Sequence, residues 1–207
     1  MGRKARISSA HGLRHLAIVA LAVAGFSLAG RGASAQQTAA DSQIAQAKAV
    51  LAKYQDPIVA VHDGYFSTVG CIEYPAGAGD HAHMMYKPGG MGVHFLNTAL
   101  LAPTLDPSKP QVLIYEPHGD TLKLVAAEWF VPVALGIKEA PAIFGHPLEG
   151  PMEGHAPIMA PELHHWDLHV WLWKNNPYGM FSPTNPDLKC PKGPYSYAGE
   201  IPKVVAP

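Results

Sequence analysis

The prolines of this chain are confined to the part that follows Gln55, and they argue against long helices there. All 20 Pro lie in that part. A proline inside a helix removes a hydrogen bond and clashes with the preceding turn, whereas turns and strand ends accommodate it. Gly and Pro recur roughly every ten residues beyond Tyr65, between short runs rich in β-branched and aromatic residues. The sequence therefore predicts short strands joined by turns from this point onward.

Five runs are the clearest strand candidates, because each is rich in strand-forming residues and is bounded by turn residues. They are residues 69–72, 92–97, 112–116, 121–133 and 165–173. The turn sequence at 117–120 predicts that the third and fourth runs form an antiparallel hairpin. The Pro- and Gly-rich stretch 134–161 predicts a long surface loop. We expect a mainly β, α+β fold: an antiparallel β-barrel or sandwich of cupin-like character.

Residues 41–64 predict a helical arm at the start of this fold. Apolar residues recur at helical spacing from Asp41 to Gln55, so that one helix face contacts the protein body. Asp56-Pro57 then suits an N-cap followed by the proline of a first turn, and Gly64 ends this second helix. After the arm, we expect a β domain at residues 65–190 and an extended tail at 191–207.

Residues 1–35 have the composition of a secretory signal peptide. They contain five basic residues and no acid, an apolar run from Leu16 to Ala29, and Ala33-Ser34-Ala35 as an A-x-A cleavage site. The run is shorter than the about 20 residues that a membrane span needs. We therefore expect cleavage, export to the periplasm or the extracellular space, and a single globular domain at 36–207 without a transmembrane segment. An uncleaved N-terminal anchor is the alternative.

The remainder of the chain is acidic and lacks arginine. Of the 15 basic residues, five lie in the leader, which leaves ten Lys against 16 acids, a balance of about −6. Arginine supplies the bidentate fork that binds phosphates and bases, and net negative charge repels polyanions. The composition therefore argues against nucleic acid as a partner and favours cations.

Two cysteines, Cys71 and Cys190, lie in the part of the chain that we expect to be exported. An oxidising compartment favours a disulfide between them. Two free thiols or a soft-metal site are the alternatives, although neither cysteine has a second one at the two-residue spacing of a zinc knuckle.

Ten of the 12 histidines lie after residue 35. Two of them, together with an aspartate, occupy every second position at the start of the last predicted strand. Alternation places His165, Asp167 and His169 on one face of the last predicted strand, followed there by Trp171 and Trp173. Neighbours on that face lie about 7 Å apart along the strand, so their side chains can converge on one ion. A solvated strand end is the alternative.

Two residues on other predicted strands could complete this set. His94 lies on an otherwise apolar strand. Glu128 is the only charged residue in an apolar row, which also contains Leu122, Leu124, Ala126 and Phe130. A buried carboxylate needs a cation, hydrogen bonds or a raised pKa.

A divalent metal ion (Zn, Cu, Fe or Mn) bound by His94, Glu128 and His169, with assistance from His165 or Asp167, would meet this need. The alternatives are a hydrogen-bonded core His94 and a strand flipped at a bulge, which turns Glu128 to water.

Two weaker candidate sites lie elsewhere. His81, His83, Met84 and Met85 combine imidazole and thioether ligands, a set that copper favours, although a flexible polar loop has the same composition. The cupin signature also begins with His-x-His, but the glutamate that should follow is missing. Glu116 lies two residues from His118 at the hairpin turn, where the two could act as an acid/base pair or be solvated.

Four segments together resemble a family of small, often exported bacterial proteins of uncharacterised function. They are GGMGVHFLN (89–97), LIYEP (113–117), Glu128-Trp129 and LHVWLWKNNPYGMFSPTNPDLKC (168–190). The likeness covers roughly residues 45–190. It implies that family motif positions are occupied by His94, Glu116, Glu128, His169 and the two cysteines.

Three functions are compatible with these patterns. The first is a metal-dependent oxygenase or hydrolase of a small-molecule substrate, with an apolar pocket shaped by Phe95, Trp171 and Trp173. The second is a periplasmic copper- or zinc-binding module without turnover, which uses the histidines and methionines at 81–85. The third is a disulfide-stapled envelope protein, in which the hydrogen bonds of Glu128 and His169 would be saturated.

Overall fold

The structure, a computed structural model, describes residues 2, 26–75, 80–81 and 84–207. The chain divides into two compact units, residues 1–36 and 37–207. Helix α1 (Phe26–Leu51) begins earlier than the predicted arm and includes the predicted cleavage site after Ala35. Within the described residues, we find no helix that is both long and apolar enough to cross a membrane. Cleavage and export remain predictions.

The helical arm of the second unit is held by one apolar face and one cap. Ala47 and Leu51 of α1 and Tyr54 of the 3-10 helix η1 (Ala52–Gln55) are buried in the main core. The Asp56 carboxylate accepts a hydrogen bond of 2.9 Å from the Ile58 N–H at the start of α2 (Pro57–His62). This confirms the predicted cap, which satisfies a backbone donor that the helix leaves free.

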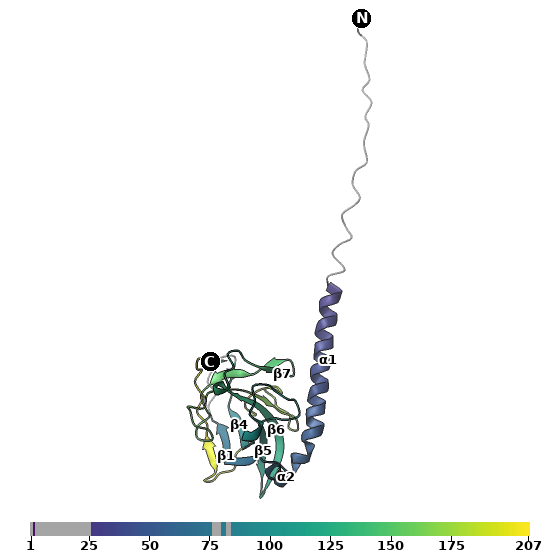
Figure 1. Cartoon of the computed structure of the whole chain (residues 1–207). Coiled ribbons are helices and arrows are strands. Elements are labelled where there is room, and N and C mark those ends of the chain that lie inside the picture. The colour runs from purple at the N-terminus through teal and green to yellow at the C-terminus, as the bar shows by residue number, and fades with distance from the viewer. Residues whose placement is uncertain (1, 3–25, 76–79, 82–83) are drawn as a thin grey trace. The chain divides into compact units, whose positions relative to one another are not determined.

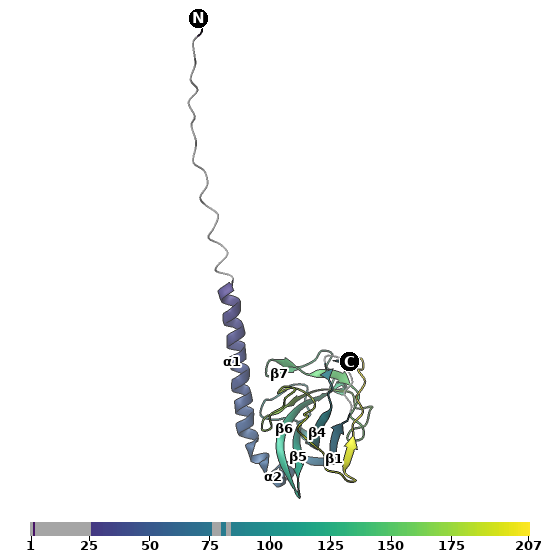
Figure 2. The ribbon, with the colours of Figure 1, turned by 180° about the vertical axis from the view of Figure 1, so that it is seen from behind.

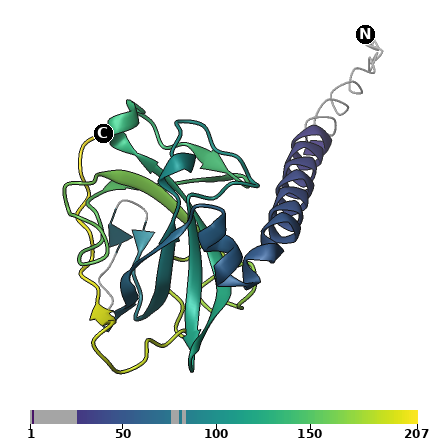
Figure 3. The same cartoon turned by 60° about the horizontal axis from the view of Figure 1, so that its bottom comes forward.

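A curled seven-stranded sheet forms the body of the second unit, in the order β11-β1-β4-β5-β6-β10-β9. All neighbours pair antiparallel except β1 and β11, which are parallel. The curled sheet does not close into a barrel, because its two edge strands, β11 and β9, do not pair with each other. It is therefore a half-barrel (Figure 3). The expected mainly β, α+β class is therefore confirmed. The strands are β1 (Phe66–Tyr74), β4 (Gly89–Leu96), β5 (Val112–His118), β6 (Thr121–Pro132), β9 (Glu149–Met152), β10 (His165–Val170) and β11 (Ser196–Ala198).

The remaining elements are short. They are β2 (Asp80–His81) paired with β3 (Met84–Met85), β7 (Ala142–Ile143) paired with β8 (His146–Pro147), and the 3-10 helices η2 (Thr98–Leu100) and η3 (Val133–Leu135). The stretch 134–161 is therefore not the uninterrupted loop that we predicted, because it forms β7, β8 and β9. The predicted hairpin is confirmed: β5 and β6 pair from Val112↔Glu128 to His118↔Thr121 and lie side by side in Figures 1 and 2.

A bulge in β6 corrects the predicted apolar row around Glu128. Tyr115 pairs with Leu124, whereas its neighbour Ile114 pairs with Ala126. Val125 is therefore an extra residue in β6. Because paired residues point to the same side of a sheet, the row changes face at this bulge. The strand is flipped as the alternative proposed, but Glu128 does not meet water, since it is only 2% exposed.

The C-terminal tail joins the two edges of the half-barrel. After β11, the Gly199 N–H donates to the Glu73 carbonyl of β1 at 2.9 Å. Farther along, the Glu153 N–H donates to the Lys203 carbonyl at 2.9 Å, and the Val205 N–H donates to the Pro151 carbonyl at 3.0 Å. The tail therefore runs from the β11–β1 edge to the β9 edge and partly pairs with it.

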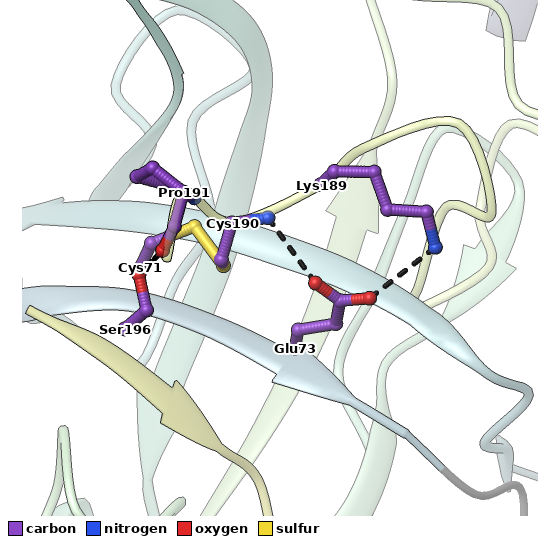
Figure 4. The surroundings of a disulfide bond; sticks show 6 residues. All are labelled: Cys71, Glu73, Lys189, Cys190, Pro191 and Ser196. Atoms are coloured by element: carbon purple, nitrogen blue, oxygen red, sulfur yellow. Dashed lines mark hydrogen bonds and ion pairs between the residues drawn. A yellow bond between two sulfur atoms is a disulfide. The ribbon is translucent and has the colours of Figure 1, made fainter. Parts of the chain in front are cut away.

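A disulfide between Cys71 and Cys190 fixes the segment that leads into this tail, as the sequence predicted. Figure 4 shows the Glu73 carboxylate beside it. The carboxylate accepts hydrogen bonds of 3.2 Å from Lys189 Nζ and from the Cys190 N–H. The bond and these contacts hold the approach to the tail against β1.

We predict that replacing both Cys71 and Cys190 with Ala lowers the free energy of unfolding by about 2–4 kcal/mol. The reason is that the bridge closes a loop with a sequence separation of 119 residues, which restricts the unfolded chain. Urea unfolding of the non-reduced protein measures this difference. Reduced wild type is the control and should match the double variant, while identical midpoints before and after reduction would contradict the prediction.

Candidate metal centre

Strand β10 presents its three chemically active side chains to one side. His165, Asp167 and His169 are each at most 1% exposed, so the solvated strand end considered as an alternative is excluded. The strand lies between β6 and β9. Its pairing with β6 sets His169 directly opposite Glu128. Backbone pairing between two central strands therefore brings an imidazole and a carboxylate together in the protein interior.

His94 joins this pair from β4, two strands away from β6. It pairs with Ile114 of β5, which pairs with Ala126 of β6, so its side chain points to the same side as Glu128. The distance from His94 Nε2 to Glu128 Oε2 is 3.5 Å, and the distance from His169 Nε2 to the same oxygen is 3.6 Å. A tetrahedral ion with bonds of about 2.0–2.1 Å holds its ligand atoms about 3.3–3.4 Å apart. The spacing within this group, the first triad, suits metal coordination.

The first triad leaves several buried polar atoms without a hydrogen-bond partner. They are His94 Nδ1, Glu128 Oε2, His169 Nδ1 and His169 Nε2. A buried polar atom without a partner costs about 1–3 kcal/mol. An ion between Glu128 Oε2 and the two Nε2 atoms would give three of the triad's atoms a ligand bond.

Burial keeps the first triad uncharged in the absence of an ion. Desolvation lowers the pKa of His94 to about 3 and that of His169 to about 4. Burial and the nearby charge of Asp167 raise the pKa of Glu128 well above its usual value. The close His–Glu contacts are therefore not ion pairs at neutral pH. Neutral imidazoles offer lone pairs to a metal, whereas Glu128 must release a proton.

A second group, the second triad, consists of His155, His165 and Asp167. The Nε2 atoms of both histidines lie 3.3 Å from Asp167 Oδ2. Burial alone would raise the pKa of Asp167, but its hydrogen bonds with His155 and His165 bring it below the usual value. Within the described residues, these two triads are the groups of three His, Cys, Asp or Glu whose ligand atoms lie within 4.8 Å of one another.

The two triads meet at Asp167. Its Oδ2 atom faces the second triad, while its Oδ1 atom lies 4.0 Å from His169 Nδ1. Asp167 Oδ1 and His169 Nδ1 both lack a hydrogen-bond partner. We expected His165 and Asp167 to assist the first triad. They belong to the second triad instead, and the Asp167 carboxylate lies between the two triads.

Of the other predicted candidates, Glu116 lies outside both triads. Glu116 accepts hydrogen bonds from Lys174 Nζ at 3.0 and 3.2 Å, and its proposed acid/base role with His118 stays a prediction. The group at 81–85 is described only in part: His83 lies outside the described residues, and for His81, Met84 and Met85 only the backbone of β2 and β3 is described.

The predicted pocket of Phe95, Trp171 and Trp173 is wrong. Phe95 follows His94 on β4 and so points to the opposite side, where its ring lies 4.6 Å from that of Tyr115. Strand β10 ends at Val170, so strand alternation does not extend to either tryptophan. Trp171 is buried in the main core, and Trp173 packs against it.

His155 is the residue that sequence reasoning missed. It lies in the stretch that we predicted to be a loop, without a strand or helix pattern to give it a direction. Its Nδ1 atom lies 3.1 Å from the hydroxyl of Tyr74 on β1. The only sequence signal was its residue type, because the contacts that bury it come from β1 and β10, both distant in sequence.

Comparisons with protein-family models, with curated proteins and with solved structures found no match to this chain. The likeness to exported bacterial proteins therefore stays a prediction, and the candidate centre is described by its own geometry.

We predict that Glu128→Gln changes the pH dependence of stability in the metal-free protein. Folded Glu128 keeps its proton well above pH 4.5, whereas the unfolded residue ionises near that value. The contribution of Glu128 to the free energy of unfolding therefore falls as the pH rises above 4.5, by up to about 1.4 kcal/mol per pH unit, and the Gln variant lacks this loss.

Urea unfolding in EDTA from pH 4.5 to 7.5 tests this. The difference between variant and wild type should grow with pH in favour of Gln. Parallel stability curves for the two proteins would contradict the raised pKa.

Proposed function

We propose that this protein binds a divalent metal ion with His94, Glu128 and His169, and that it uses the ion as an oxygenase or a hydrolase of a small molecule. Two histidines and one carboxylate are the ligand set of non-haem iron oxygenases, and His₂Glu is also a catalytic zinc set. Three protein ligands leave a coordination position open. When bound, the ion would activate dioxygen or water there. Zn, Fe, Cu and Mn all suit nitrogen and oxygen ligands.

The unpartnered atoms of the first triad carry this proposal. The purely structural alternative expects saturated hydrogen bonds around Glu128 and His169. Instead, Glu128 Oε2 and both ring nitrogens of His169 are buried without a partner. Glu128 Oε2 and His169 Nε2 lie 3.6 Å apart, and leaving both without a hydrogen bond is costly unless something binds between them. This observation favours a metal-binding protein over a disulfide-stapled envelope protein that binds no ligand.

Burial narrows the kind of reactant that we propose. His94 is the most exposed member of the first triad at 5%, followed by Glu128 at 2% and His169 at 1%. Water, dioxygen or a small organic molecule suits such a centre better than a polymer does. The disulfide fits an oxidising compartment, and export to the periplasm is part of this proposal.

Metal analysis of the full chain, purified without a His-tag, tests the proposal. His94→Ala and His169→Ala should each lose about one equivalent of metal, whereas His118→Ala should keep it. His118 is an exposed histidine at the hairpin turn and is the matched control. Added Zn, Cu, Mn or Fe should raise the melting temperature of wild type, since a ligand at 100 times its Kd stabilises a protein by about 2.7 kcal/mol. A folded, metal-free wild type that none of these ions stabilises would contradict the proposal.

A double variant separates this proposal from a non-catalytic binding module at residues 81–85. If His94, Glu128 and His169 hold the ion, His81→Ala combined with His83→Ala should leave metal content nearly unchanged. Loss of metal in that double variant, with retention in His94→Ala, would favour copper or zinc delivery instead. Inductively coupled plasma mass spectrometry gives both numbers on the same preparations.

A further inference from the structure

The second triad has the features of a metal site of its own. His155 lies in the segment that follows β9, while His165 and Asp167 lie two residues apart on β10. All three are buried, at 2%, 0% and 1% exposure. We propose that His155, His165 and Asp167 bind a second divalent ion, of the zinc class, independently of the first triad.

The distances within this group support coordination. Each histidine Nε2 atom lies 3.3 Å from Asp167 Oδ2. This is the separation of about 3.3–3.4 Å between ligands of a tetrahedral zinc ion with bonds of about 2.0–2.1 Å. All three ligand atoms lie within 4.8 Å of one another. One ion can therefore reach them without a large shift of any side chain.

The other ring nitrogen of each histidine is already engaged. His165 Nδ1 lies 3.0 Å from the Leu163 carbonyl oxygen, and His155 Nδ1 lies 3.1 Å from the Tyr74 hydroxyl. A carbonyl oxygen only accepts, so His165 Nδ1 carries the hydrogen. Metal-binding histidines typically donate their second N–H in this way and bind the ion through the other ring nitrogen, which here is Nε2.

The surroundings hold both rings in these orientations. The Phe130 ring stacks on His165 with 4.5 Å between centroids. The segment that carries His155 folds back on itself: the Gly154 N–H donates to the Pro161 carbonyl at 3.1 Å, and the His155 carbonyl accepts from the Met159 N–H at 2.9 Å. A Cβ at Gly154 would overlap the Ala160 carbonyl, so this close approach requires glycine. Such preorganisation is what a metal site needs.

Asp167 would serve the two sites with different oxygens. Oδ2 belongs to the second triad, whereas Oδ1 lies 4.0 Å from His169 Nδ1 and has no hydrogen-bond partner. An ion on Oδ2 leaves Oδ1 free to accept the His169 N–H, which would orient His169 for the first ion. Glu149, paired with Asp167 across β9 and β10, adds a further carboxylate beside this site.

Zinc stoichiometry of the untagged full chain tests the inference. After loading with Zn²⁺ and dialysis, wild type should hold two equivalents by plasma mass spectrometry. His155→Ala and His94→Ala should each hold one, their combination none, and His118→Ala two. His155→Gln is a second variant that preserves bulk if the Ala variant does not fold, and thermal melting in EDTA checks folding of each protein. In His94→Ala, Zn²⁺ should still raise the melting temperature.

The outcomes separate this inference from the proposed function. A wild type with one equivalent that His155→Gln retains and His94→Ala loses would overturn the second site and leave the first intact. It would make the second triad a hydrogen-bond network. One equivalent lost in His155→Gln and kept in His94→Ala would overturn the first site alone. Loss of both equivalents in either single variant would overturn the independence of the two sites.

Discussion

The pairing of β6 with β10 is the constraint on which the candidate centre depends. It sets His169 opposite Glu128 and gives Asp167 and His165 their direction, so one backbone register positions members of both triads. A shift by one residue would move all of these side chains to the other side of the sheet. The hydrophobic residues of β10 specify the register, because Trp166, Leu168 and Val170 are buried on the opposite face. Core packing thus fixes the polar face as well.

Six histidine and carboxylate side chains are buried close together beside one sheet, which is an unusually high number. Each loses hydration, and burial makes the neutral form of His94, His169 and Glu128 the favoured one. Hydrogen bonds offset part of this cost around Asp167, while the first triad has few. Polar groups that weaken a fold in this way are commonly found at functional sites, which is why the centre is more informative than the rest of the core.

The tail and the disulfide complete a fold that the sheet leaves open. A half-barrel has two edges, and the segment after β11 runs from one edge to the other. The disulfide secures its approach at β1, and backbone hydrogen bonds secure its end at β9. His155 lies just after β9, close to that end of the tail. The integrity of the second triad therefore depends on segments that are far apart in the sequence.

The sequence by itself determined the local features: the β class from Pro and Gly spacing, the Asp56 cap, the β5–β6 hairpin, the disulfide partners and the alternation of His165, Asp167 and His169. It also singled out His94 and Glu128, because a polar or charged residue in an apolar run must be explained. Tertiary structure decided which of these residues meet. The bulge at Val125, the end of β10 at Val170 and the position of His155 depend on pairing between distant segments, and such long-range contacts leave no periodic signal in a single sequence. For that reason the residues of one predicted site, together with His155, form two triads that meet where Asp167 of the second faces His169 of the first.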